Sequence, residues 1–104
     1  MNHSFWLKKL LEITIERDAS DLHISVGHPP VLRITRQLVD LESEKVITPK
    51  DSQGLAFSLM TPLQKEKFLR EKEIDFAYDF EGKARFRVNV FFQRGMVSVA
   101  LRLI

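Results

Sequence analysis

The spacing of hydrophobic residues over the first 18 positions predicts an amphipathic helix. Ser4 stands where its hydroxyl can cap the N-terminus of that helix. The residues that recur at helical spacing are Trp6, Leu7, Leu10, Leu11 and Thr14. Lysines and glutamates lie between them, so this segment lacks the uninterrupted apolar stretch of a signal peptide.

From Asp21 onward the pattern changes to strict alternation, which predicts a strand over 21–26 that Gly27 and two prolines end. We expect its apolar side chains to face the core and its polar ones to face outward; these are Leu22, Ile24 and Val26, and then Asp21, His23 and Ser25. Two further short strands, VLRI and LVDL, follow on either side of the segment TRQ.

Two helix starts come next, and both place a threonine before a proline. Thr48-Pro49 and Thr61-Pro62 each set a capping hydroxyl before a proline at the first helical position, and Gln64 completes a capping box with Thr61. The apolar residues expected on these helices are Leu55, Phe57 and Leu59 on the first, and Leu63, Phe68 and Leu69 on the second.

The last third of the chain reads as three strands, EIDFAYDF, ARFRVNVFF and MVSVALRLI, with turns at 81–83 and 94–95 between them. Helix, strands, helices and then an antiparallel meander predict an α+β fold with an open antiparallel sheet covered by helices on one face. At 104 residues, this is expected to be one domain, 1–104.

The amino-acid composition limits which partners, metal sites and catalytic groups this chain can have. Sixteen basic against 14 acidic residues leave a net charge of only +2, which does not demand nucleic acid as a partner. The chain has no cysteine, which excludes thiolate metal sites and a cysteine nucleophile. The spacing of His23 and His28 gives no shared face for a metal, and no Walker A motif is present, so the chain alone is not expected to hydrolyse a nucleotide.

The predicted strand register makes two of the arginines a candidate anion site. If Arg94-Gly95 is a two-residue hairpin turn, every pair on one face of the hairpin is apolar, and Arg87 faces Arg102 on the other. Like charges directly opposite in a sheet are unfavourable, so two arginines so placed favour an anion between them. The planar guanidinium suits phosphate because it can donate to two oxygens at once.

Arg85 is interpreted differently. A three-residue loop at 81–83 pairs apolar with apolar and sets Asp79 opposite Arg85, which we expect it to neutralise. Asp75 falls diagonal to Arg87 and is expected to compensate it in part. The pattern by itself leaves two readings open: a solvated charged face, or an anion site.

Three segments resemble a known family: ASDLHISVGHPPVLRI (19–34), DFAYDFEGKARFRVNVFFQRG (75–95) and the closing LRLI. Together they are similar to the N-terminal domain of the type II and type IV secretion-pilus ATPases, and most of all to the pilus-retraction, or twitching-motility, branch. The resemblance spans nearly the whole chain.

The resemblance implies a PAS-like domain that precedes a RecA-like ATPase core absent from this chain. It implies a homohexamer that uses ATP and Mg²⁺, with no cofactor, catalytic residue or metal ligand of its own expected in this domain. Arg87 and Arg102, and more weakly Arg94, are expected to contact the nucleotide phosphates. The implied partners are the ATPase core of the same or a neighbouring subunit and an inner-membrane pilus platform protein, with the motor in the cytoplasm at that membrane and not inserted in it.

One departure from the family concerns Thr35-Arg36-Gln37, where relatives commonly have an Asp-Gly turn. Because an arginine stands where glycine is usual, we expect this hairpin to be longer or differently shaped. Only 18 residues precede Ala19, which favours the retraction branch over relatives with an additional N-terminal domain. The alternatives are a related secretion, extension or competence ATPase, a free-standing PAS-like interaction module and, least favoured, a nucleic-acid-binding domain.

Overall fold

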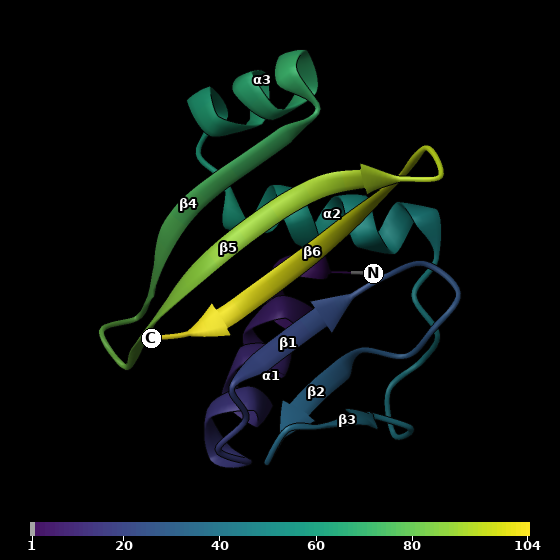
Figure 1. The fold of residues 1–104 in the computed structure, drawn as a ribbon. Helices are drawn as coiled ribbons and strands as arrows, with labels where there is room; N and C mark the ends of the chain where they lie inside the picture. Colours follow the sequence, from purple (N-terminus) through teal and green to yellow (C-terminus); the bar gives the residue numbers. More distant parts are fainter. Residues whose placement is uncertain (1) are drawn as a thin grey trace.

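The computed structural model describes residues 2–104, and its strands form one six-stranded antiparallel sheet in the order β3-β2-β1-β6-β5-β4 (Figure 1). The elements are α1 (His3–Glu16), β1 (Asp21–Ile24), β2 (Val31–Ile34), β3 (Gln37–Asp40), α2 (Pro49–Leu59), α3 (Pro62–Glu71), β4 (Glu73–Phe80), β5 (Ala84–Gln93) and β6 (Met96–Leu103). This is the α+β, PAS-like architecture that the sequence predicts.

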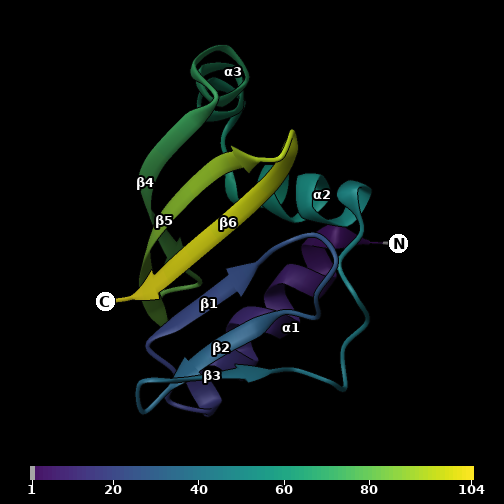
Figure 2. The same ribbon diagram turned by 45° about the vertical axis from the view of Figure 1, so that its right-hand side comes forward.

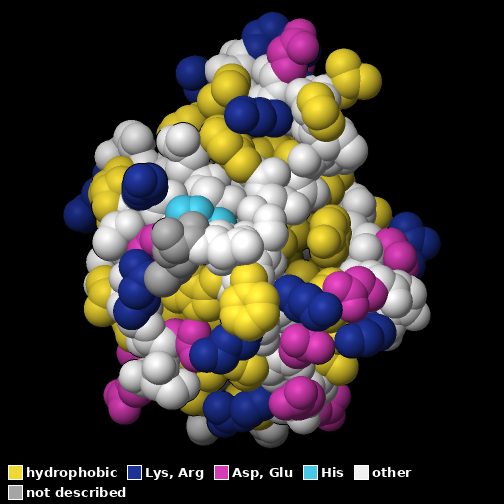
Figure 3. All heavy atoms as spheres, turned by 180° about the vertical axis from the view of Figure 1, so that it is seen from behind, with side chains coloured by type: hydrophobic (Ala, Val, Ile, Leu, Met, Phe, Trp, Pro, Cys, Tyr) yellow, Lys and Arg dark blue, Asp and Glu magenta, His cyan; other side chains and the backbone are white. Residues whose placement is uncertain are grey.

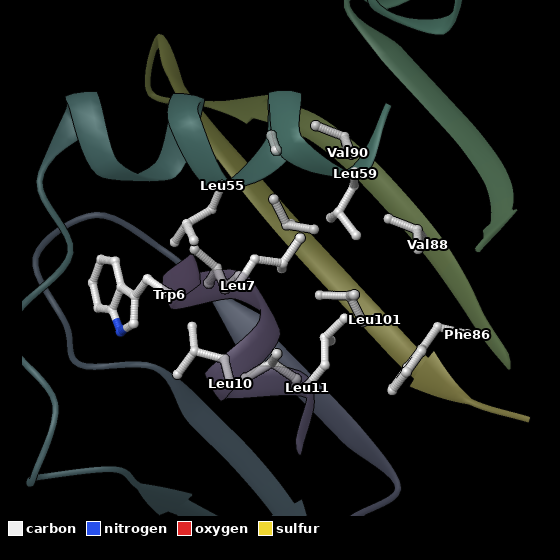
Figure 4. Packing of buried hydrophobic residues seen from close by; sticks show 14 of the residues in the cluster. Trp6, Leu7, Leu10, Leu11, Leu55, Leu59, Phe86, Val88, Val90 and Leu101 are labelled. Carbon is white, nitrogen blue, oxygen red and sulfur yellow. The ribbon is translucent and has the colours of Figure 1, made fainter. Parts of the chain in front are cut away.

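Helices cover one face of the sheet only. In Figures 1 and 2, α1 and α2 lie together behind the sheet, whereas the opposite face carries no helix of the described chain. The core lies between these helices and the sheet, where side chains from both layers interdigitate (Figure 4). Its fully buried members include Leu10, Leu22, Leu55, Phe86 and Leu101. We call the two sides the helix face and the open face.

Local sequence decides where the helices begin. All five residues predicted on the apolar face of α1 are buried. The prediction that Ser4 caps this helix is wrong: α1 starts earlier, and the Asn2 side chain accepts the hydrogen bond from the Phe5 N–H at 3.0 Å. Thr48 and Thr61 cap α2 and α3 as predicted, and both helices have a capping box.

The apolar face predicted for α3 is wrong in part. Phe68 is buried and its ring stacks on Phe92, with centroids 4.9 Å apart and planes 5° apart. Leu63 and Leu69 are instead 78% and 44% exposed. The reason is tertiary: α3 lies at the start of β4, away from the layer formed by α1 and α2 (Figure 1). Hydrophobic side chains reach the surface in this part of the molecule, at the top of Figure 3.

The predicted registers of the last three strands are confirmed. Arg87 pairs with Arg102 across β5 and β6, and Asp79 pairs with Arg85 across β4 and β5. The expectation of a longer β2–β3 hairpin is wrong, because Ile34 pairs with Gln37 around a two-residue turn. Thr35 and Arg36 adopt left-handed conformations there, with φ of 50° and 69°, although neither is a glycine.

Candidate functional site

A row of charged residues crosses the open face of the sheet. Arg87 on β5 pairs with Arg102 on β6, which pairs with Asp21 on β1, which in turn pairs with Arg33 on β2. Cross-strand partners point to the same side of a sheet, and Phe86 and Val88 beside Arg87 are buried under the helices. These four side chains therefore share the open face; we call them the arginine row.

Part of the arginine row lines a shallow hollow of about 190 Å³. The hollow lies over β4, β5, β6 and β1, and it is lined by uncharged as well as charged residues. Its lining residues are Asp21, His23, Asp75, Arg87, Asn89, Ala100, Leu101 and Arg102. The structure thus brings Arg87 and Arg102 to one solvent-facing depression.

Arg102 is held by an acid that the sequence analysis did not connect to it. Its Nε donates to Asp21 Oδ1 at 3.2 Å, although the arginine side chain remains 73% exposed. Asp21 faces the open side as predicted, yet it is buried. The contact joins residues 81 apart in sequence, and only the pairing of β1 with β6 makes them neighbours.

The pKa of Asp21 lies below its ordinary value. Burial raises the pKa of this carboxyl, but hydrogen bonds from Ser20 and Arg102 and the nearby positive charge outweigh burial. Ser20 Oγ donates to Asp21 Oδ2 at 2.7 Å. Asp21 is therefore ionised at neutral pH and attracts the arginines on both sides of it.

Arg87 is exposed and forms no ion pair within residues 2–104. Asp75, which we expected to compensate it, lines the same hollow but accepts a hydrogen bond from Asn89 Nδ2 at 3.3 Å. The charge of Arg87 is thus left available on the open face. Of the two arginines that face each other, one is held by an acid and one is not.

The predicted neutralisation of Arg85 by Asp79 is wrong, although the register is right. Asp79 Oδ2 accepts a hydrogen bond from the Gly82 N–H at 3.2 Å, so this carboxylate caps the 81–83 loop. No ion pair within 4.0 Å joins Asp79 to Arg85. The Gly82 N–H competes with Arg85 for the Asp79 carboxylate, and strand register alone does not reveal this competition.

Arg94 lies apart from the other two candidates. It stands in the β5–β6 turn and lines a different hollow, of about 360 Å³, together with Ser25, His28 and Ser98. Six strand residues, 88–93, lie between it and Arg87, so seven steps along the strand put the two about 23 Å apart. Arg94 therefore does not share the hollow at the arginine row.

The part of the chain that the structure describes shows neither a metal-binding cluster nor a membrane-spanning helix. Residues 2–104 contain no group of three or more His, Asp or Glu side chains that could hold a metal ion. None of the helices described is long and apolar enough to cross a membrane.

Comparison with known sequences finds pilus ATPases. The chain is 31% identical over 97 residues to the type IV pilus ATPase PilU of Pseudomonas aeruginosa, covering 93% of this chain and 25% of PilU. It is 33% identical over 102 residues to the type IV pilus retraction ATPase PilT of the same organism, covering 94% and 28%. The chain thus spans about a quarter of the length of these relatives, and no family model matches it.

Comparison with solved structures finds the same group of proteins. The pilus retraction motor PilT with bound ADP superposes with a TM-score of 0.84 at 39% identity, over 91% of this chain and 28% of that one. The Legionella pneumophila ATPase DotB superposes with a TM-score of 0.81 over 97% and 29%, at 24% identity, which establishes likeness of fold alone. Sequence and fold together match one part of these longer proteins.

Proposed function

This chain resembles the N-terminal domain of the secretion-pilus ATPases, as its sequence predicted, and we propose that it serves as that domain in a motor for type IV pilus retraction. In this proposal a RecA-like core elsewhere in the protein binds ATP and Mg²⁺, and six subunits form a ring. The domain closes over the core of its own or a neighbouring subunit. An inner-membrane platform protein receives the resulting motion, and the motor stays in the cytoplasm at that membrane.

The pairing of Arg87 with Arg102 on the open face is the observation that carries this proposal. Two guanidinium groups directly opposite each other repel unless an anion lies near both. The hollow beside them faces solvent on the side that no described helix covers, so a second domain can approach it. A phosphate chain carried by the ATPase core fits the charge and the donor geometry of this pair.

The chemistry that the arginines supply is stabilisation of charge. Phosphoryl transfer spreads negative charge over the transferred group and the leaving oxygen, and fixed cations lower the energy of that state. Arg87 and Arg102 approach the phosphates only when this domain closes over the core, so closure and hydrolysis become coupled. Arg94, about 23 Å along the strand from Arg87, would contact a different part of the ligand or of the core.

The test uses the protein that joins this domain to its ATPase core. Arg87→Gln and Arg102→Gln should each lower ATP turnover roughly tenfold or more, because each removes a cation from the transition state. Arg85→Gln is the matched control, since Arg85 lies on the same strand and face two residues away, is exposed and has no ion pair within 2–104. Wild-type turnover in both the Arg87 and the Arg102 variant would contradict the proposal.

A further inference from the structure

Three side chains converge on the carboxylate of Asp21, the acid in the middle of the arginine row. Ser20 Oγ donates to Oδ2 at 2.7 Å, Arg102 Nε donates to Oδ1 at 3.2 Å, and Arg33 Nε lies 3.8 Å from Oδ2. The Asp21 side chain is only 9% exposed. A buried carboxylate with each oxygen engaged is fixed in orientation, because rotating it would break contacts on both sides.

The backbone around Asp21 is also fixed. β1 lies between β2 and β6 in the middle of the sheet. At its start, the Ser20 N–H donates to the Arg33 carbonyl and the Leu103 N–H donates to the Ser20 carbonyl, both at 2.9 Å. Asp21 is thus held from two neighbouring strands, and any group it orients is oriented relative to the whole sheet.

The atom by which Arg102 contacts Asp21 decides what the contact can do. The hydrogen bond is made by Nε, on the inner edge of the guanidinium, and the side chain stays 73% exposed. No other hydrogen bond of this side chain lies within residues 2–104. The two terminal Nη groups are free, and in a planar guanidinium their direction is set once Nε is held.

We propose that Asp21 is the positioning residue of Arg102: it holds Nε so that the terminal fork of the guanidinium points at the phosphate. The inference rests on the proposed function, because it gives Asp21 a role toward the same ligand. Arg87, which has no such acid, supplies charge without a fixed orientation. The pair therefore combines one oriented donor with one free cation.

Asp21 orients Arg102 without cancelling the positive charge of the row. The row holds three arginines and one aspartate, which leaves a net charge of +2 at neutral pH from 3 minus 1. Arg33 lies on the far side of Asp21 and shares its charge. At the hollow itself Asp21 and Asp75 formally balance Arg87 and Arg102, so an anion is attracted by the guanidinium donors and not by a net charge of the hollow.

The first experiment is a double-mutant cycle on ATP turnover in the protein that carries the ATPase core. Asp21→Asn should lower kcat about three- to tenfold, because it replaces the charged acceptor of Arg102 with a neutral amide that binds it more weakly and can turn its NH₂ group toward the guanidinium. In the Arg102→Gln background the same change should cause no further loss. Asp40→Asn, which alters an exposed acid on the same face of edge strand β3, is the control and should leave kcat unchanged.

The second experiment compares arginine with lysine at the two positions. A lysine ammonium cannot donate to Asp21 from one edge and present a planar fork from another. Arg102→Lys should therefore lose as much turnover as Arg102→Gln, whereas Arg87→Lys should keep several-fold more than Arg87→Gln.

Each result separates the two proposals. Wild-type kcat in Asp21→Asn, or an equal loss in both backgrounds, overturns the positioning role while leaving the proposed function standing. Wild-type turnover in Arg102→Gln alone also overturns the positioning role, and wild-type turnover in both Arg102→Gln and Arg87→Gln overturns the proposed function itself. If thermal melting finds Asp21→Asn unfolded, Ser20→Ala replaces it, because it removes a hydrogen bond from Asp21 without unpairing a charge. That variant should lower kcat in the wild-type background only; any other pattern contradicts the positioning role.

Discussion

The two faces of the sheet are built from the same strands, but one packs the core and the other presents charged side chains to solvent. On the helix face, Phe86 and Leu101 of β5 and β6 are buried among apolar side chains. On the open face, Arg87 and Arg102 stand next to them in sequence and reach solvent. Because successive residues of a strand point to opposite sides, stability and ligand contact are assigned to alternate positions.

Each face also has one buried aspartate, and the two differ in what they leave free. Asp51 accepts from His3 Nε2 at 3.1 Å and from the Thr48 N–H at 3.0 Å, and it also pairs with Lys45. These contacts join the start of α1 to the start of α2. Asp21 instead leaves the outer edge of its arginine open. An acid whose partners all belong to the fold stabilises the fold, whereas one that holds a largely exposed arginine can also serve a site.

The largest loss of stability should come from removing a large apolar side chain from the core on the helix face. Phe86→Ala should lower the free energy of unfolding by about 3–5 kcal/mol, because it leaves a cavity under α1 and α2. Its sequence neighbour Arg87→Gln should change that free energy by less than about 0.5 kcal/mol. Urea unfolding of this chain measures both. Similar losses in the two variants would break the division between the faces.

A smaller change in the free energy of unfolding is expected from substituting Gly54 of α2, in the helix layer. Helix propensity alone predicts that Gly54→Ala stabilises by about 1 kcal/mol. A Cβ at this position would lie 2.2 Å from Nδ1 of His3, so the imidazole must move and its bond to Asp51 is lost. Gly54→Ala should therefore destabilise the chain by about 1–3 kcal/mol in urea unfolding.

The control for Gly54 is the same change without the imidazole. In a His3→Ala background, Gly54→Ala should raise the free energy of unfolding, since only the propensity gain remains. A loss of equal size in both backgrounds would mean that His3 is not the obstacle. It would also weaken the view that the His3–Asp51 contact fixes α1 on α2.

The smallest effect should be the response to acid of the two buried aspartates. Burial raises the pKa of Asp51, but hydrogen bonds from Lys45, Thr48 and His3 outweigh it, and the pKa of Asp21 is lowered too. A carboxyl with a lowered folded pKa stabilises the fold above its unfolded pKa, about 3.9, and that stability is lost as the pH falls. Asp51 should cost roughly 1 kcal/mol of stability between pH 7 and pH 3, and Asp21 should cost stability in the same direction.

Unfolding free energies across this pH range, measured for wild type, Asp51→Asn and Asp21→Asn, compare the faces directly. Each variant should lose less stability on acidification than wild type. The difference should equal what the missing carboxyl contributes to the acid response of wild type. An unchanged acid response in the Asp51 variant would contradict the network on the helix side. The same result at Asp21 would contradict its ion pair with Arg102.

Sequence reasoning succeeded where one local rule decides the outcome. The two-residue turn at Arg94-Gly95 and the three-residue loop at 81–83 fixed three strands in register, and that placed Arg87 opposite Arg102. The same reasoning failed where a local rule met a competitor. Asp79 had a backbone donor at Gly82 closer than its cross-strand arginine, and the Ile34–Gln37 pairing is made over two non-glycine residues in left-handed conformations.

The sequence by itself determined which residues alternate, how α2 and α3 are capped and which arginines meet across one hairpin, because turn length and side-chain period are local properties. The tertiary structure decided that β1 lies beside β6, and therefore that Asp21 holds Arg102 across 81 residues. It likewise decided that α3 leaves Leu63 exposed. Strand order and helix placement follow from how separate elements bury their surfaces together, which no single segment encodes.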